Sequence, residues 1–252
     1  MNLLIKNGMI VLEEEVFEGD LLIENGLISK IGKNLENFDK KYKQINLNKE
    51  YVLPGGVDVH THFNIDVGVK SVDDFYSGTL AAAFGGTTTI IDHMGFGPKG
   101  CNQYYQLNKY HEYAKENAVI DYSFHGVIQH INDEVLNEIR ILSEEEGITS
   151  FKLYMTYDYK LSEDEILNFL NKTKDMGVII CVHAEIHEMI DKLRKFFVEQ
   201  ELKSPLYHSL SRPNESESLA VKRLIEISQN AVNNNLYIVF ILCKQYCFLR
   251  KF

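Results

Sequence analysis

From Tyr51 onward, short apolar runs alternate with longer amphipathic segments, and this alternation restricts the possible folds more than any other feature. Apolar runs of about 4–8 residues are typical of buried strands, whereas apolar residues spaced three and four positions apart are typical of helices. Strands that alternate with helices build a parallel sheet, because each helix carries the chain back across the sheet to start the next strand. We therefore expect an α/β fold.

The expected strands cover residues 52–60, 87–92, 120–128, 149–154, 178–183 and 236–242. The expected helices cover residues 73–84, 103–116, 133–146, 163–176 and 215–232. The helix over 163–176 is the best marked, because Ser162 and Glu165 can form a capping box and Gly177 follows its last residue. A closed (β/α)8 barrel typically needs about 250 residues, so the pattern predicts an incomplete TIM-type barrel over residues 51–252.

Residues 1–50 have a different pattern, in which short alternating apolar runs are separated by Asn7-Gly8 and Asn25-Gly26. Asn-Gly between such runs is a strong hairpin signal, because both residues tolerate the positive φ of a tight turn. The sequence therefore predicts a small β region before the barrel.

Composition excludes some partners. The chain has 36 acidic and 26 basic residues and a net charge of -10, which opposes binding to nucleic acid or to an anionic membrane. The first residues lack the pattern of an export signal, and the apolar run Leu236–Cys243 is too short to cross a bilayer, which takes about 20 residues. Four scattered cysteines fit a reduced compartment, so we expect a globular cytoplasmic protein.

The sharpest chemical motif is the His60-Thr61-His62 segment at the end of the first barrel strand, preceded by Asp58. Two imidazoles two residues apart in an extended segment point the same way, so both can reach one divalent metal ion. Active sites of such barrels lie at the carboxyl ends of the strands. The motif therefore predicts a metal site, and the alternative is a pair of structural or exposed histidines.

Two later strands carry further candidate ligands. Lys152 lies inside the apolar run Ser150–Tyr154, and a buried ammonium must be paired, neutralised or modified. Taken alone it fits a lysine that extends its charge to solvent; beside His60 and His62, a lysine carbamylated by carbon dioxide would be an anionic ligand able to bridge two metals. His183 ends the next strand, where it is a candidate ligand at the same rim or a structural histidine.

These motifs lie in longer segments that closely resemble the dihydropyrimidinase and D-hydantoinase family of the amidohydrolase superfamily. The similar segments are residues 53–63, 73–79, 81–92, 121–125, 150–152, 183–185 and 212–213. The resemblance extends from residue 1 to about Val239 and implies a (β/α)8 barrel beside a β-sandwich. It divides the chain into an N-terminal β-sandwich segment, 1–50, and a partial metal-dependent hydrolase barrel, 51–252.

The resemblance implies zinc-dependent hydrolysis of cyclic amides, in which dihydropyrimidine or hydantoin rings open to N-carbamoyl amino acids. By residue matching, His60 and His62 would bind one Zn²⁺, carbamylated Lys152 (N6-carboxylysine) would bridge, and His183 would bind a second Zn²⁺. Tyr157 matches the tyrosine that contacts the substrate and stabilises the oxyanion; the alternative is an aromatic side chain packed at a strand end.

The sequence departs from the family pattern at Phe240, where the family has another histidine ligand, and the tail to Phe252 resembles the family no longer. The family's last ligand, an aspartate that also moves the proton, would lie beyond Phe252. Such a loss of resemblance is expected after a frameshift or a premature stop, and the alternative is genuine divergence. We expect the activity of this chain to be impaired.

Other functions remain as alternatives: a non-catalytic assembly protein of the same fold, similar to the collapsin response mediator proteins, or a fragment without function. Retention of His60, His62, Lys152 and His183 favours the enzyme. The full-length family is commonly tetrameric, so a homotetramer is expected for a complete protein, with a small cyclic ureide or imide as its substrate.

Two related enzyme classes fit less well. Dihydroorotases have an arginine two residues after the second histidine, whereas Phe63-Asn64 follows His62 here. Allantoinases fit less well than dihydropyrimidinases at Tyr157 and at Thr87–Thr89. The remaining histidines are expected to have structural roles: His93, His111, His125, His130, His187 and His208.

Overall fold

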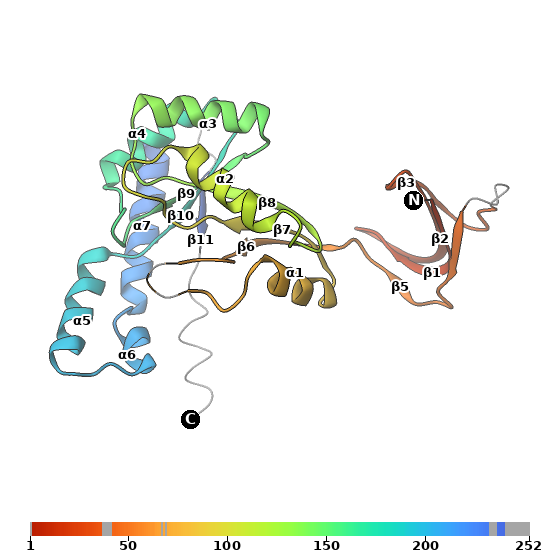
Figure 1. The fold of residues 1–252 in the computed structure, drawn as a ribbon, viewed down its shortest axis with the longest axis horizontal. Coiled ribbons are helices and arrows are strands. Elements are labelled where there is room, and N and C mark those ends of the chain that lie inside the picture. Colours follow the sequence, from red (N-terminus) through yellow and green to blue (C-terminus); the bar gives the residue numbers. More distant parts are fainter. Residues whose placement is uncertain (1, 37–41, 67, 69, 232–235, 240–252) are drawn as a thin grey trace. The chain divides into compact units, whose positions relative to one another are not determined.

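A computed structural model describes residues 2–36, 42–66, 68, 70–231 and 236–239 (Figure 1). The chain separates into two compact units, Met1–Gly56 and Val57–Phe252. The division at residues 50 and 51 that the resemblance implies stays a proposal. None of the helices within the described residues is long and apolar enough to cross a membrane.

The N-terminal β segment is confirmed as a five-stranded sheet. Its strands are β1 (Leu3–Val11), β2 (Val16–Glu24), β3 (Leu27–Gly32), β4 (Lys43–Asn46) and β5 (Tyr51–Val52). Strand β2 pairs antiparallel with both β1 and β3, whereas β4 and β5 lie parallel to β1. The sheet therefore combines a hairpin meander with two strands that arrive from farther along the chain.

One of the two hairpin predictions is confirmed and the other is wrong. Asn25-Gly26 forms the turn between β2 and β3, with φ of 53° and 81°. Asn7-Gly8 instead lies inside β1, at a shift in the register with β2. Asn7 has the positive φ of 56° that a bulge needs, and its N–H donates to Asp20 Oδ1 at 2.9 Å. A Cβ on Gly8 would lie only 2.8 Å from Val52 Cγ2 in the adjacent strand β5. Glycine therefore fits at position 8, where any side chain would clash.

The second unit contains the expected α/β architecture. Its strands are β6 (Gly56–Thr61), β7 (Thr87–His93), β8 (Asp121–Val127), β9 (Ser150–Tyr154), β10 (Ile179–His183) and β11 (Leu236–Val239). They form one six-stranded sheet in chain order, and neighbours from β7 to β11 pair in parallel. A parallel sheet in sequential order with a helix after each of its first strands is part of a (β/α)8 barrel, which confirms the incomplete barrel.

The helices that connect these strands match most of the predicted ranges. They are α1 (Phe75–Phe84), α2 (Gln103–Ala114), α3 (Asp133–Glu145), α4 (Glu163–Thr173), α5 (His187–Glu199), α6 (Pro205–Leu210) and α7 (Asn214–Asn230). The capping box of Ser162 and Glu165 is confirmed. Helix α4 ends before the predicted Met176, however, and Gly177 adopts its φ of 65° in the turn that follows.

Helices α5 and α6 were not predicted from the sequence. Ile190, Leu193 and Phe197 in α5 are spaced three and four residues apart, which is the helical signal that could have identified it. Residues 240–242 of the last predicted strand and the tail from Phe240 to Phe252 lie outside the described residues.

The core lies between the sheet and its helices. Its largest fully buried side chains include Phe75, Phe124, Phe151, Phe169, Leu153 and Leu170. Because side chains alternate along a strand, Phe151 and Leu153 point to the helical side of β9 and Lys152 points to the opposite side. Lys152 therefore lies on the inner side of the sheet, away from the helices.

We expect Leu224→Ala in α7 to lower the free energy of unfolding by about 2–5 kcal/mol, because the fully buried leucine leaves a cavity. The matched control is Leu219→Ala in the same helix, where the leucine is 45% exposed; it should cost less than about 1 kcal/mol. Chemical denaturation followed by circular dichroism measures both. Equal losses for the two variants would contradict the packing of α7 on this core.

Candidate functional site

His60 lies in β6 and His62 directly follows it, so the extended backbone directs both rings the same way. Their Nε2 atoms are 3.3 Å apart. Two nitrogens that each lie ~2.05 Å from one tetrahedral zinc ion are separated by about 3.3 Å. The spacing of this pair therefore suits two ligands of a single zinc ion.

Two histidines that the sequence analysis assigned to structural roles lie against this pair. The ring of His93 has its centroid 4.4 Å from that of His60 and 5.1 Å from that of His62, and it stacks on His125 at 4.1 Å. His93 is buried at the end of β7, and its Nδ1 has no hydrogen-bond partner among the described residues. Its position at a strand end was the sequence signal that could have placed it in the site.

Asp92, next to His93, fixes the chain on both sides of His62. Its Oδ2 accepts hydrogen bonds from Thr61 Oγ1 at 2.7 Å and from the Phe63 N–H at 2.9 Å. Burial raises the pKa of this carboxyl to about 6, and the two donors oppose that shift. The end of β6 is therefore tied to β7 beside the histidine pair.

His125 ties three strands together. Its Nε2 lies 2.9 Å from the Val59 carbonyl oxygen, which can only accept, so Nε2 carries the proton. Its Nδ1 then accepts from the Ser150 hydroxyl at 2.5 Å. These bonds join β6 and β9 through β8, and they hold His125 as a neutral imidazole.

The electrostatics of the site favour neutral imidazoles. Desolvation and the nearby charge of Lys152 lower the pKa of both His60 and His62 to about 4, although both side chains stay partly open to solvent. His93 and His125 also have lowered pKa values, again chiefly because of burial. Only a neutral imidazole has a lone pair for a metal, and these lowered pKa values keep the four rings neutral near neutral pH.

Lys152 lies on the inner side of β9 and is 2% exposed. Burial lowers the pKa of its amine to about 8, because the desolvated ammonium is unfavourable. Its Nζ lies 5.7 Å from the centroid of the Tyr154 ring. This burial disfavours the alternative of a lysine that extends its charge to solvent, because the amine lies in the protein interior.

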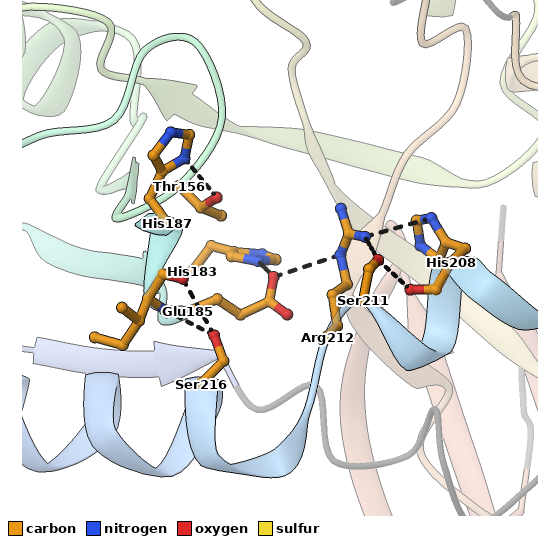
Figure 2. Close-up of polar contacts among 9 residues, drawn as sticks. Thr156, His183, Glu185, His187, His208, Ser211, Arg212 and Ser216 are labelled. Atoms are coloured by element: carbon orange, nitrogen blue, oxygen red, sulfur yellow. Dashed lines mark hydrogen bonds and ion pairs between the residues drawn. The ribbon is translucent and has the colours of Figure 1, made fainter. Parts of the chain in front are cut away.

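His183 ends β10 and contacts a buried acidic residue. Its Nε2 lies 2.6 Å from Glu185 Oε2, and that oxygen lies 3.9 Å from Arg212 Nε (Figure 2). The ring of Tyr157 has its centroid 5.1 Å from that of His183, and its backbone has a φ of 73°. Burial is the largest cause that raises the pKa of the Tyr157 phenol, and the charge of Glu185 adds to it.

The predicted site residues thus lie at one rim. Lys152 and, when protonated, His183 each lower the pKa of both His60 and His62 by their charge, an effect that requires proximity. Within the described part of the chain, however, no group of three or more His, Cys, Asp or Glu side chains converges on one metal position. The structure gathers the predicted residues and brings the Nε2 atoms of His60 and His62 together, while the role of each residue stays a prediction.

Comparison with known proteins agrees with this architecture. Residues 51–221 match the model of the Amidohydrolase family. A D-phenylhydantoinase of Escherichia coli O9:H4 (strain HS) is 52% identical over 240 residues, which cover 95% of this chain and 52% of that protein. The chain therefore spans about half the length of the curated relatives that it matches.

Solved structures show the same similarity in three dimensions. A D-hydantoinase has a TM-score of 0.89 and 41% sequence identity, with 96% of this chain and 52% of that chain covered. A dihydropyrimidinase from Brevibacillus agri NCHU1002 has a TM-score of 0.89 and 35% identity, with the same coverage. From the half-barrel, the strand-end histidines and the family match over residues 51–221, the chain belongs to the amidohydrolase family.

Proposed function

We propose that this chain forms the metal-binding half of a zinc-dependent cyclic amidohydrolase that opens dihydropyrimidine or hydantoin rings to N-carbamoyl amino acids. The observation that carries the proposal is the 3.3 Å spacing of the His60 and His62 Nε2 atoms at a strand end of a half-barrel. The similarity to hydantoinases and dihydropyrimidinases supports the substrate class. Amidohydrolases generally use metal ions, and this donor set suits one.

The ligand roles follow from the chemistry of each side chain. His60 and His62 would hold one zinc ion through neutral nitrogens, His183 would hold a second, and Lys152, once carbamylated, would supply oxygen ligands. When bound, such a pair of zinc ions makes a hydroxide available near neutral pH and polarises the carbonyl that it attacks. Asp92 and His125 keep the strand ends in place through their hydrogen bonds.

Tyr157 would act on the substrate directly. The raised pKa of its phenol keeps the hydroxyl protonated, so that it can donate a hydrogen bond to the oxyanion that develops on the attacked carbonyl. The contact of its ring with that of His183, a proposed metal ligand, supports this role. Tyr157 therefore serves both in substrate binding and in catalysis.

The activity of this chain is proposed to be impaired. Position 240, where the family pattern continues into a histidine, is Phe240, whose side chain has no ligand atom. A cytoplasmic location, and a homotetramer for a complete protein, are part of the same proposal. The assembly-protein alternative is less favoured, because the His60 and His62 pair keeps a spacing that suits a metal.

Zinc binding is the first test of these ligands. We expect His60→Ala to weaken zinc binding by at least about 10-fold, because one of two paired nitrogens is lost. His111→Gln, a change at an exposed histidine of α2, is the matched control and should bind zinc as the unsubstituted chain does. Competition with a coloured chelator measures the affinity. Equal affinity in His60→Ala and the control would contradict the site.

Carbamylation of Lys152 should depend on pH. Only the neutral amine reacts with carbon dioxide, and burial lowers the pKa from 10.5 to about 8, so raising the pH from about 6 to 8 increases the reactive fraction. At constant dissolved ¹³C-labelled carbon dioxide, the ¹³C signal of a carbamate should grow over this range.

The variant Lys152→Arg should lose this carbamate signal, whereas Lys172→Arg, a change at a partly exposed lysine of α4, should keep it. A signal that persists in Lys152→Arg, or that does not change with pH, would show that another amine is modified.

Ring opening tests the proposed function itself. With zinc and bicarbonate present, we expect the chain to open hydantoin or dihydrouracil slowly, seen as a loss of ultraviolet absorbance. Tyr157→Phe should lower kcat by about 10²–10³-fold, because the oxyanion loses a hydrogen-bond donor. No turnover from soluble, zinc-loaded protein would contradict the proposed activity of this chain.

A further inference from the structure

Glu185 is an acidic side chain in the protein interior, with 3% of its surface exposed. One of its oxygens, Oε2, lies 2.6 Å from His183 Nε2 and 3.9 Å from Arg212 Nε (Figure 2). A buried carboxylate is unfavourable unless partners compensate its charge, and here a histidine and an arginine do so from two different elements. The arrangement joins a proposed metal ligand to a residue that precedes α7.

The backbone holds this array in place. The segment after β10 is anchored to the first turn of α7, because the Ile186 N–H donates to Ser216 Oγ at 2.9 Å and to the Ser216 carbonyl oxygen at 3.2 Å. Ser216 is fully buried. Arg212 lies just before α7 and Glu185 just before Ile186, so the same anchor brings the guanidinium to the carboxylate.

The contact determines which nitrogen of His183 carries the proton. An ionised carboxylate can only accept, so His183 Nε2 must be the donor in the 2.6 Å contact. The lone pair of the neutral ring then resides on Nδ1. Histidines that bind a metal through one nitrogen commonly donate the other N–H to a carboxylate, which fixes the ring and makes it a better ligand.

Arg212 reaches a second residue of the proposed site. Its guanidinium lies close enough to the Tyr157 hydroxyl to lower the pKa of that phenol by charge and by hydrogen bonding, although burial still raises it overall. Its Nη1 also donates to Ser211 Oγ at 3.2 Å and lies 3.4 Å from His208 Nδ1. One guanidinium therefore faces both the carboxylate that holds His183 and the phenol proposed to bind the oxyanion.

We propose that Glu185 and Arg212 are positioning residues: Glu185 fixes His183 as the Nε2–H tautomer with Nδ1 as its metal-binding atom, and Arg212 holds Glu185 and Tyr157 in one array. This inference rests on the proposed function, because it assigns His183 to a metal. The same arginine aligns the proposed metal ligand His183 and the proposed oxyanion donor Tyr157, so a change at Arg212 disturbs both.

The tautomer can be measured without any metal. In ¹⁵N NMR spectra of the metal-free 252-residue chain, we expect His183 to carry its proton on Nε2 alone. In Glu185→Gln, a change of nearly equal shape, the amide can present either its oxygen or its NH₂ group, so both tautomers should appear. The control Glu188→Gln, at an exposed acid of α5, should leave the spectrum unchanged. A single tautomer that is unaffected by Glu185→Gln would overturn the role of Glu185.

Zinc affinity tests whether Glu185 and Arg212 act together on His183. Glu185→Gln and Arg212→Gln should each weaken zinc binding by about 10–100-fold. The double variant should lose no more zinc affinity than the weaker-binding of the two single variants, because both residues act through His183. Fully additive losses would overturn the shared array. Circular dichroism checks that each variant is folded. If the unsubstituted chain binds no zinc, the proposed function fails, while the tautomer measurement still decides the role of Glu185.

Discussion

The carboxyl ends of parallel strands meet at one rim, and every feature of the candidate site depends on this constraint. Strands β7, β9 and β10 end in His93, Tyr154 and His183, and His60 is the second-last residue of β6. These residues are far apart in the sequence, yet the sheet order brings the strand ends together. Hydrogen bonds between side chains and backbone then hold the strand ends together at this rim. Asp92 ties Thr61 and Phe63 to β7, and His125 ties Val59 to β9, so the histidine pair has a defined position before any ligand binds.

The rim concentrates groups that would repel one another if all were charged. Desolvation and mutual repulsion keep the imidazoles neutral, and burial lowers the pKa of the Lys152 amine to about 8. A cluster of neutral imidazoles beside a buried amine has no evident packing purpose, whereas it suits a cation that needs neutral nitrogen ligands. At the other side of the rim, Glu185 and Arg212 compensate each other and direct His183.

Much of the fold and of the candidate site could be predicted from the sequence. Hydrophobic periodicity locates the strands and helices, and the ends of parallel strands show which side chains share a rim. The strands of the half-barrel, the cap of α4 and the convergence of His60 and His62 followed from spacing alone. His93 was missed because a single histidine at a strand end has no partner two residues away to mark it. Asn7-Gly8 was misassigned because Asn-Gly tolerates a positive φ both in a tight turn and at an irregularity within a strand, and only the neighbouring strand distinguishes the two.

Anomalous diffraction at the zinc absorption edge, from crystals of the 252-residue chain grown with zinc and bicarbonate, tests the central claim most directly. We predict a peak about 2.0–2.1 Å from the Nε2 atoms of both His60 and His62, with density for a carboxylated Lys152 beside it. No peak at the pair, with the two Nε2 atoms still in hydrogen-bond contact, would contradict the account and leave the histidines as a structural pair.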